Sequence, residues 1–504
     1  MKPLSIPVFI ACLLALAAHP APAAPDKNAK PSKALGDIDA FITRLKYSPE
    51  KLLSTLDSGT VVNFPDKSTT PNKSIILCKS RVVTDNRPLE AITLLSPTTG
   101  VVYPGALVVA DRNLAEGKPT VISLPQGPVQ VSVDLPFMGS KGTVQVQDPT
   151  YGNVQSAIQD LQLAWLGGRR GQDTGQAARQ SLLAQKAFSS QQIALALGFN
   201  AKWDTGNTLK INSEMSQNAT SSSCFLLFRQ VYFTASVQPP KRPSAVFADG
   251  VTLEDLKDVA GLSAERPPAY IQSVDYGRIV MVRMDTQSAE SSADLTMAMK
   301  FAVAGGQSVD AETKLKYEKI IKNSTFTAIT LGGNAEEATT ILGSPDKVEA
   351  RLYDLIKKCS IFSEKNPAVP ISYKVNFLKD NTLATMNVTT KYTDWDCKEY
   401  PEGFVKLSHK GGYVARFEVH YDYTDAKGKK QLHEDYSSGN KTAGWKETVK
   451  LPGDATNIQI QAFYKTGIAW DPEREVLNVK LPGPSNKTYE LTGTVANAGF
   501  DTKD

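Results

Sequence analysis

Two stretches of the chain, 192–220 and 293–322, alternate between apolar and polar residues with a period of two. In each stretch a short turn, rich in polar residues or glycine, separates two arms. This period is typical of a strand with one apolar and one polar face. Each arm has roughly the nine to eleven residues that a tilted strand needs to cross a bilayer. The apolar positions are Ile193, Leu195, Leu197, Phe199, Leu209 and Ile211 in the first stretch, and Leu295, Met297, Met299, Phe301, Val303, Leu315 and Tyr317 in the second.

The second stretch also carries a helical signal. Residues 311–321 are mostly good helix formers, and Tyr317, Ile320 and Ile321 lie on one helical face. Local propensity and periodicity therefore disagree, which is expected at functional sites. One interpretation is that both stretches are helical in a soluble form and become membrane hairpins. The other is that they are hairpins or helices of an ordinary globular core. The pattern alone favours this second interpretation, because short alternations are common.

The remaining segments predict a mixed α and β protein with three or four domains in its 504 residues. From Gly403 onward the chain alternates almost without interruption, which indicates a separate C-terminal β-sandwich. Helices are expected over 37–56, 153–165, 253–259 and 345–358. Strands are expected within 58–135 and 371–389, and over 223–237, 270–284 and 326–331.

The N-terminus has the features of a secretory signal peptide over 1–23. Lys2 precedes an apolar segment, 6–18, and Ala21-Pro22-Ala23 fits a small-residue cleavage site. Residues 24–36 are then expected to be a disordered leader. No later segment approaches eighteen consecutive apolar residues, so a membrane role has to use strands or surface contact. Basic and acidic residues are interspersed at a net charge of +4, which gives no indication of a nucleic-acid partner.

Signals for catalysis are weak. The histidines that follow the signal are His409, His420 and His433, all in the predicted sandwich. His433-Glu434 begins a zinc-protease-like string, but position 437 is a serine where the second histidine would stand. The sequence contains no nucleophile elbow and no phosphate-binding loop. We therefore expect no enzymatic activity, no catalytic residues, no cofactor and no metal centre.

The cysteines beyond the signal are Cys78, Cys224, Cys359 and Cys397, and their spacing matches no metal-ligand motif. A secreted protein is permitted a disulfide, but nothing in the sequence pairs these residues. Buried free thiols are therefore the preferred expectation.

Residues 464–474 read Tyr-Lys-Thr-Gly-Ile-Ala-Trp-Asp-Pro-Glu-Arg and are expected to form a loop between two sandwich strands. Trp470 in this loop is amphipathic and suits a membrane–water interface. The alternative is that Trp470 folds back under its own sandwich.

This stretch resembles the undecapeptide of the cholesterol-dependent cytolysins, whose usual form is Glu-Cys-Thr-Gly-Leu-Ala-Trp-Glu-Trp-Trp-Arg. The residues that match are Thr466, Gly467, Ala469, Trp470 and Arg474, with Ile468 and Asp471 as conservative replacements. Ordered strings elsewhere resemble the same family, so the resemblance covers nearly the whole mature chain. Among these strings are 103–107, 148–152, 326–333, 370–373 and 377–381.

The resemblance implies an α+β fold. The molecule would be an elongated four-domain pore-forming toxin with a central twisted sheet, flanking helical bundles and a C-terminal β-sandwich. The implied boundaries are 37–53, 89–181, 236–282 and 358–381 for a discontinuous domain 1, 54–88 and 382–402 for an elongated β domain 2, 182–235 and 283–357 for domain 3, and 403–504 for the membrane-binding sandwich.

The resemblance also implies roles for particular residues. The two alternating stretches align with helical bundles that unfold into transmembrane hairpins in the family. Gly332 and Gly333 match a glycine hinge from which a short edge strand swings away, and Phe326 matches an aromatic residue at the subunit contact. The residues implied in membrane and cholesterol binding are Gly412, Ala443, Lys465, Thr466, Gly467, Ile468, Ala469, Trp470, Arg474, Thr494 and Val495.

Some positions depart from the family pattern. Lys465 replaces the thiol, so thiol-dependent activity is not expected, and Pro472-Glu473 replaces the tryptophan pair. Thr494-Val495 matches the family's Thr-Leu cholesterol pair only in part. An acid–base pair that helps to trigger insertion in the family is replaced by Ala184 and Ser344.

The proline of the variant undecapeptide resembles family members that use a protein co-receptor. Those members carry a Tyr-x-Tyr element, present here as Tyr421-Asp422-Tyr423, followed by Arg-Ser, where this chain has Ser438-Gly439. The resemblance thus implies a secreted cytolysin that binds cholesterol-containing membranes, forms a large ring with copies of itself and inserts a β-barrel into the target-cell membrane. A protein or glycan co-receptor would be a further partner. The alternative is a receptor- or glycan-binding relative that docks with weak or no sterol-dependent lysis.

Overall fold

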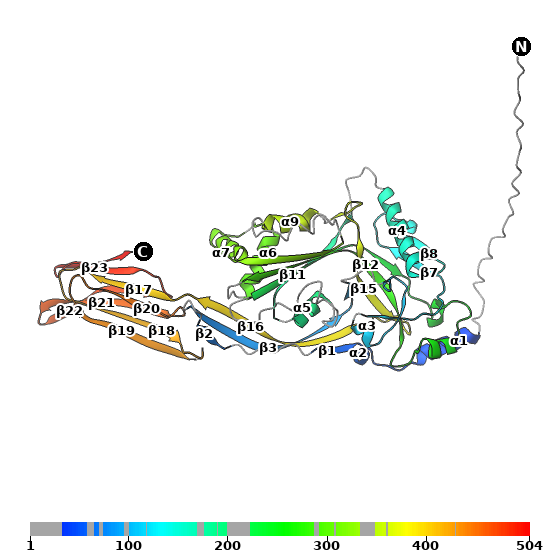
Figure 1. The fold of residues 1–504 in the computed structure, drawn as a ribbon, viewed down its shortest axis with the longest axis horizontal. Helices are drawn as coiled ribbons and strands as arrows, with labels where there is room; N and C mark the ends of the chain where they lie inside the picture. Colours follow the sequence, from blue (N-terminus) through cyan, green and yellow to red (C-terminus); the bar gives the residue numbers. More distant parts are fainter. Residues whose placement is uncertain are drawn as a thin grey trace, which may run out of the picture.

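The protein is an elongated α+β molecule in which a β-sandwich stands at the end of a long, narrow sheet (Figure 1). None of the described helices is long and apolar enough to span a membrane. The predicted signal peptide and residues Phe199, Leu209, Ile211, Gly333 and Ser344 lie outside the described residues. The structure is a computed structural model and describes residues 33–57, 65–69, 74–94, 100–116, 118–168, 176–188, 190–198, 222–286, 292–306, 309–332, 348–358, 361–428 and 430–503.

Two long strands, β11 (Ser222–Val237) and β12 (Pro268–Thr286), form the centre of a ten-stranded antiparallel sheet. Their nearly continuous apolar runs predict burial on both faces, and both strands are buried along most of their length. The strand predictions for 223–237 and 270–284 are therefore confirmed. The other strands are β4 (Ile92–Thr93), β5 (Leu107–Val109), β6 (Thr120–Val121), β7 (Val129–Val133), β8 (Thr143–Val146), β10 (Arg179–Ala187), β13 (Ser324–Leu331) and β15 (Val369–Phe377).

Helix α4 (Tyr151–Gly167) packs on the half of this sheet that lies farthest from the sandwich (Figure 1). It begins at Thr150, whose side chain accepts a hydrogen bond from the Asn153 amide at 3.3 Å. Its buried face confirms the helix predicted over 153–165 and consists of Val154, Ile158, Leu161 and Trp165. The shorter helical segments of the same region are α3 (Arg112–Ala115), η1 (Gly139–Gly142), η2 (Pro243–Val246) and η3 (Asp255–Val259).

The helix predicted over 37–56 is wrong in its second half. The structure has α1 (Lys33–Arg44), a second short helix α2 (Pro49–Leu52), and then a strand, β1 (Ser54–Asp57). Proline has no N–H and cannot continue a helix, so Pro49 opens a new one. The next residues pair in parallel with a distant strand, and this tertiary pairing replaces the expected helix.

The half of the large sheet nearest the sandwich consists of β10, β11, β12 and β13 in that order. Helices α6, α7 and α9 cover one face of these strands, and α5 covers the other. The described arms of both alternating stretches are therefore helical, so of the second interpretation, hairpins or helices of a globular core, the hairpins are wrong for this form. The helices are α5 (Ser190–Leu197), α6 (Ser292–Val303), α7 (Ala311–Lys322) and α9 (Val348–Lys358), the last within the predicted range 345–358.

A narrow sheet connects this body to the sandwich, and a disulfide crosses it. Its main strands are β3 (Ile75–Leu89) and β16 (Met386–Tyr400), with β1 and β2 (Lys67–Thr69) at its edges. Cys78 and Cys397 lie directly opposite each other on β3 and β16 and form a disulfide. The expectation of free thiols is wrong for this pair, because only the strand register brings residues 319 positions apart together. Cys224 is a buried free thiol, and Cys359 lies outside the described residues.

Removing this disulfide is expected to destabilise the narrow sheet. The Cys78→Ala/Cys397→Ala variant should lose about 2–4 kcal/mol, because the crosslink no longer restricts the unfolded chain. The measurement is the calorimetric unfolding midpoint of the full chain. Cys224→Ala is the control, because it removes a buried thiol from a different hydrophobic cluster. A double variant that unfolds no earlier than the control would contradict a stabilising role.

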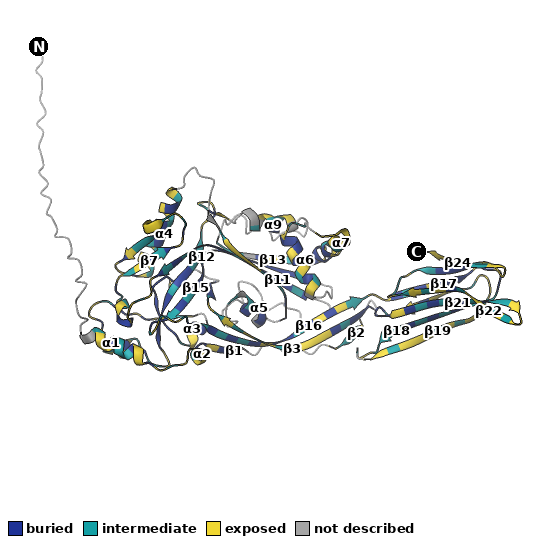
Figure 2. Ribbon diagram, turned by 180° about the vertical axis from the view of Figure 1, so that it is seen from behind, coloured by how far each residue is buried: buried dark blue, intermediate teal, exposed yellow. Residues whose placement is uncertain are grey.

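The C-terminal region is the predicted β-sandwich. Its facing sheets have the strand orders β20-β17-β23-β24 and β19-β18-β21-β22, and buried residues alternate with half-buried ones along β18 and β21 (Figure 2). The residue boundaries of the four domains stay a prediction. The strands are β17 (Gly403–His409), β18 (Ala415–Thr424), β19 (Gln431–Lys441), β20 (Lys446–Leu451), β21 (Thr456–Ile468), β22 (Asp471–Leu481), β23 (Thr488–Thr494) and β24 (Asn497–Lys503). A two-stranded sheet of β9 (Gln176–Ala177) and β14 (Ile361–Phe362) completes the described fold.

Candidate functional site

The variant undecapeptide forms the end of the hairpin β21–β22, at the end of the sandwich remote from the narrow sheet (Figure 1). The expected connection between two sandwich strands is confirmed, but its extent over 464–474 is wrong, because only Ala469 and Trp470 lie outside the two strands. Trp470 is 89% exposed, which excludes the alternative that it folds back under its own sandwich. The structure therefore presents the indole to solvent at the tip of the molecule.

The backbone of this hairpin end is held by short-range hydrogen bonds. The Thr466 hydroxyl donates to the Asp471 carbonyl and accepts from the Ile468 amide at 3.0 Å. Gly467 has φ +78°, a left-handed conformation that favours glycine. These contacts give Trp470 a defined position at the turn.

Two of the departures from the family pattern contact each other. Lys465 lies opposite Glu473 on the paired strands, and the two form an ion pair. Arg416 on β18 also contacts the Glu473 carboxylate at 3.0 Å. The hydrogen bonds from Lys465 and then Arg416 lower the pKa of Glu473. The residues at the positions of the thiol and of one tryptophan thus form a cross-strand charge pair.

The other loops implied in membrane binding meet the undecapeptide at the same end. The Gly412 amide donates to the Gly493 carbonyl at 2.8 Å, which places Gly412 beside Thr494. The Lys465 amide donates to the Val414 carbonyl at 2.8 Å, so the segment after Gly412 also contacts the undecapeptide.

The turn that contains Ala443 belongs to the same end of the sandwich. The Gly444 amide donates to the His409 carbonyl at 2.7 Å, and the His409 amide donates to the Trp445 carbonyl at 2.9 Å. Ala443 itself is exposed. The structure therefore brings the predicted membrane-binding residues of four separate segments to one end of the sandwich.

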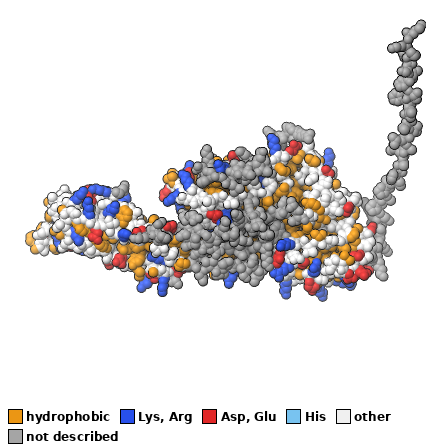
Figure 3. All heavy atoms as spheres, in the orientation of Figure 1, with side chains coloured by type: hydrophobic (Ala, Val, Ile, Leu, Met, Phe, Trp, Pro, Cys, Tyr) orange, Lys and Arg blue, Asp and Glu red, His pale blue; other side chains and the backbone are white. Residues whose placement is uncertain are grey.

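Figure 3 shows hydrophobic side chains at this end of the molecule, on the left of the view. The exposed apolar side chains of the predicted segments are Ile468 (40%), Trp470 (89%) and Val495 (41%). Phe500 on β24 is also 40% exposed, and sequence reasoning missed it. The seven-residue strand that carries Phe500 has no clear alternation that could have identified it.

Strand β23, which leads to Thr494, is fixed by a charge cluster. The Glu490 carboxylate accepts hydrogen bonds from Lys503 and Ser408 and lies 3.2 Å from Lys410 Nζ. These donors, Lys503 first, lower the pKa of Glu490 to about 2, so the carboxylate is charged at neutral pH.

A second candidate site lies at the edge strand β13. Gly332 follows this strand with φ +76°, and an added Cβ would stand 2.6 Å from the Gly277 carbonyl oxygen and 2.8 Å from Val369 Cγ2. The position therefore requires glycine for both conformation and space. Phe326 on β13 is partly buried against the core beneath α6 and α7. Gly333 and the segment after it lie outside the described residues.

The segment that leads into α5 contacts the narrow sheet. The ring of Phe188 lies 5.0 Å from Trp395 and 5.9 Å from Tyr392, both on β16. Lys186 Nζ donates to the Trp395 carbonyl at 3.3 Å, and burial lowers the pKa of Lys186. This cluster also contains the disulfide. Sequence reasoning missed it because its members are about 200 residues apart in the chain.

Two family models match the chain. The thiol-activated cytolysin model matches residues 37–400, and the model of the thiol-activated cytolysin β-sandwich domain matches 404–498. The chain belongs to the thiol-activated cytolysin family.

Individual cytolysins are similar along nearly the whole chain. Tetanolysin from Clostridium tetani is 34% identical over 466 residues, which cover 91% of this chain and 86% of tetanolysin. The crystal structure of listeriolysin O matches with a TM-score of 0.82 at 29% identity and covers 96% of this chain and 99% of that one. A disulfide-locked mutant of intermedilysin with human CD59 matches with a TM-score of 0.79 at 27% identity, over 93% and 98% of the chains.

In this cytolysin the helices bury most, but not all, of the apolar positions in the alternating stretches. Met297 is 43% exposed and Leu315 is 68% exposed, although both belong to the period-two pattern. A helix cannot place every second residue on one face, whereas a strand does. Leu197 ends α5. The buried positions are Ile193, Leu195, Leu295, Met299, Phe301, Val303 and Tyr317.

Proposed function

We propose that this protein is a secreted pore-forming cytolysin that binds cholesterol-containing membranes, assembles into a ring and inserts a β-barrel. The observation that carries the proposal is how the helical segments are connected. Helices α6 and α7 join β12 and β13, which are already paired neighbours, and the stretch with α5 joins β10 and β11 in the same way. Unfolding the helices into strands would lengthen two existing hairpins.

The register of β12 and β13 supports this change. Thr286 pairs with Ser324, and continuing the pairing one residue at a time places Leu295 opposite Leu315, with the turn at Gly305. Opposite residues of an antiparallel pair point to the same face, so the apolar positions of both arms share one face. Gly305 already has φ +73°, a conformation that tight turns use.

One ion pair fits both forms of this segment. In the helical form Lys316 Nζ lies 2.6 Å from Asp294 Oδ1, which links α7 to α6. The continued register places Asp294 directly opposite Lys316 on the polar face of the extended hairpin. The same two side chains would therefore help to hold the register after conversion.

Docking on the membrane is assigned to the end of the sandwich. Trp470 and the flanking apolar side chains Ile468 and Val495 are exposed there and would enter the membrane interface. Thr494 and the segments around Gly412 and Ala443 would lie beside them at the same surface.

Ring assembly is assigned to the outer edges of β10 and β13. Within the described residues each of these strands pairs on one side only, and an unpaired edge is a template for another strand. The two strands run in opposite directions, so β13 of one subunit and β10 of the next would extend an antiparallel sheet. The segment that would swing away after Gly332 lies outside the described residues. A closed ring pairs every backbone group, as a membrane barrel requires.

A protein co-receptor is a further part of the proposal. The similar intermedilysin was solved with human CD59, which supports a partner of this kind. In the Tyr-x-Tyr element of this chain Tyr421 is buried in the sandwich core and Tyr423 is half-buried. A co-receptor would therefore contact this element through β18 and its neighbour β19 rather than through the ring of Tyr421.

Leakage of dye from liposomes tests the proposed function. The mature chain should release dye from cholesterol-containing liposomes at least tenfold faster than from sterol-free liposomes of the same phospholipid. Flotation of the liposomes reports binding separately. Binding without leakage at high protein concentration would contradict pore formation and favour a relative that only docks. Equal leakage from both liposomes would contradict the role of cholesterol.

A further inference from the structure

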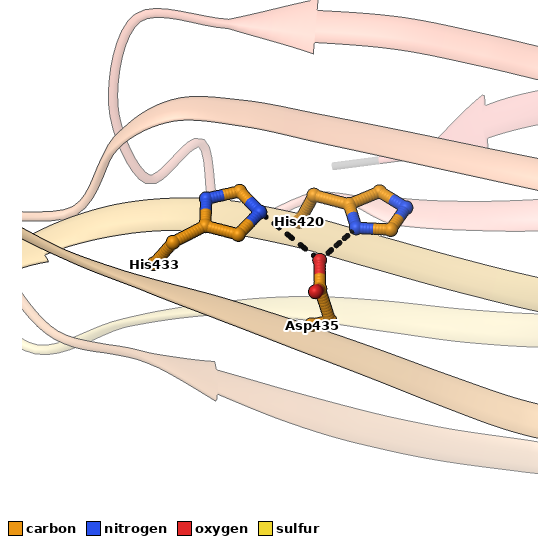
Figure 4. Close-up of side chains that lie close together, drawn as sticks. All are labelled: His420, His433 and Asp435. Carbon is orange, nitrogen blue, oxygen red and sulfur yellow. Dashed lines mark hydrogen bonds and ion pairs between the residues drawn. The ribbon is translucent and has the colours of Figure 1, made fainter.

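The outer face of the sandwich carries a cluster of metal-ligating side chains that the pore mechanism does not use. His420 on β18 lies directly opposite Asp435 on β19, and His433 lies opposite Asp422 in the same ladder. Residues two apart on a strand share a face, so these side chains form one patch. One ligand atom each of His420, His433 and Asp435 lies within 4.8 Å of the others (Figure 4).

His433 is oriented as a ligand by a hydrogen-bond chain behind it. Its Nδ1 lies 2.6 Å from Asp422 Oδ1, and the other Asp422 oxygen accepts a hydrogen bond from Asn457 Nδ2 at 2.8 Å. With an ion bound, the Asp422 carboxylate would hold the proton on Nδ1 and leave the Nε2 lone pair for the metal. Nε2 faces Asp435 Oδ1 at 3.0 Å. A carboxylate behind a histidine in this way is the usual support of a metal-bound imidazole.

His420 approaches the same point from the other side. Its Nδ1 contacts Asp435 Oδ1, and its Nε2 lies 3.7 Å from Glu418 Oε2, so a carboxylate also stands behind this ring. The two imidazole rings are nearly parallel, with an angle of 7° and a centroid separation of 6.3 Å. Figure 4 shows one nitrogen of each ring directed at the Asp435 oxygen.

We propose that His420, His433 and Asp435 bind one Zn²⁺ ion, or a similar divalent transition metal. Two imidazole nitrogens and one carboxylate oxygen form a donor set that Zn²⁺ accepts, with water as the fourth ligand. The Asp435 side chain is 64% exposed, so it is free of packing that would prevent its rotation to make room for the ion. Asp422 and Asn457 are positioning residues that act through His433.

The consequence is a crosslink between β18 and β19. Strand β19 is the edge of its sheet, and its partner in the described sandwich is β18. The ion would add bonds across this pair and stabilise the sandwich by an amount that rises with the logarithm of its concentration above the Kd. Because each ligand belongs to the same sheet, the site forms without a second subunit and independently of the pore.

Isothermal titration with ZnCl₂ tests the site in the full mature chain after removal of metals with a chelator. We expect one saturable site that His420→Ala and His433→Ala each weaken at least tenfold. Asp422→Ala should weaken binding about 10–100-fold through the loss of ring orientation. Asp501→Asn, which alters an exposed carboxylate of the other sheet, is the matched control and should bind as the wild type does.

A thermal measurement keeps the test independent of variant folding. Zn²⁺ should raise the unfolding midpoint of the wild-type chain with increasing concentration, and Ca²⁺ should not, because Ca²⁺ prefers oxygen ligands. Circular dichroism establishes that each variant is folded. Absence of a saturable site in the wild type, or equal Zn²⁺ affinity in folded His433→Ala, would overturn the proposal. His409, the other described histidine, does not compete for the ion in this test, because it is buried and its Nε2 lies 2.7 Å from the Tyr413 carbonyl oxygen.

Discussion

Replacing Trp470 with alanine should weaken binding to cholesterol-containing liposomes by roughly 30-fold or more. A buried tryptophan removes about 150–250 Å² from water, and at about 25 cal/mol per Å² half of that burial contributes about 2–3 kcal/mol. Trp470 is 89% exposed in the soluble form, so nearly all of this gain remains for the membrane. Flotation of liposomes over a range of lipid concentrations measures the loss.

Phe137 provides the matched control for Trp470. It is also 89% exposed, but it lies at the opposite end of the molecule, between β7 and β8. Phe137→Ala should leave binding unchanged. Equal losses in the two variants, or no loss with Trp470→Ala, would contradict the assignment of docking to the end of the sandwich.

Replacing Gly332 with valine should reduce lysis at least tenfold and leave membrane binding intact. Valine disfavours the positive φ of this position, and its Cβ would meet the Gly277 carbonyl oxygen at 2.6 Å. The proposed movement of the following segment needs dihedral freedom that glycine alone supplies. Binding is retained because the docking surface lies in a separate sandwich. Haemolysis and native-gel analysis of membrane-bound oligomers measure the two effects.

Gly250→Val separates backbone strain from the hinge. Gly250 has φ +94°, but an added Cβ would meet nothing within 4 Å. Gly250→Val and Gly332→Val both place valine at a positive φ, at a cost of about 1–3 kcal/mol each. Gly250, however, does not lie at the edge strand β13. Lysis should therefore stay near the wild-type level in Gly250→Val. Wild-type lysis by Gly332→Val would refute the hinge.

Strands with strong patterns could be predicted from the sequence. Two local signals were enough: the apolar runs of β11 and β12, and the alternation of the sandwich strands. In each case the pattern of apolar residues within the strand indicates which of its faces are buried. The family resemblance added the position of the exposed end around Trp470. The helix expected over 37–56 was wrong in its second half because a strand pairing far along the chain decides the state of Ser54–Asp57.

Contacts between distant segments could not be predicted. The Cys78–Cys397 disulfide, the packing of Phe188 on Trp395 and the pairing of Lys465 with Glu473 all depend on strand register. A single sequence does not contain that information. The cluster of His420, His433 and Asp435, proposed as a metal site, also depends on strand register, and its residues follow no metal-ligand spacing motif along the chain.

The two alternating stretches were ambiguous for a different reason. Their period belongs to a strand, while their composition permits a helix, and their described arms form helices. The helical form leaves the apolar side chains of Met297 and Leu315 exposed to solvent. Propensity and period can both be correct if each describes a different state of the chain.

Fluorescence scanning of 294–303 tests most directly whether α6 converts into a membrane strand. An environment-sensitive dye is attached to one introduced cysteine at a time, in a chain with Cys224 and Cys359 replaced by alanine. After lysis of cholesterol-containing liposomes, we expect dyes at odd-numbered positions, including 295, 297, 299 and 301, to report lipid. Dyes at even-numbered positions should report water. A helical period in the membrane-bound emission, or no change from the soluble form, would contradict the conversion of α6 into a membrane strand.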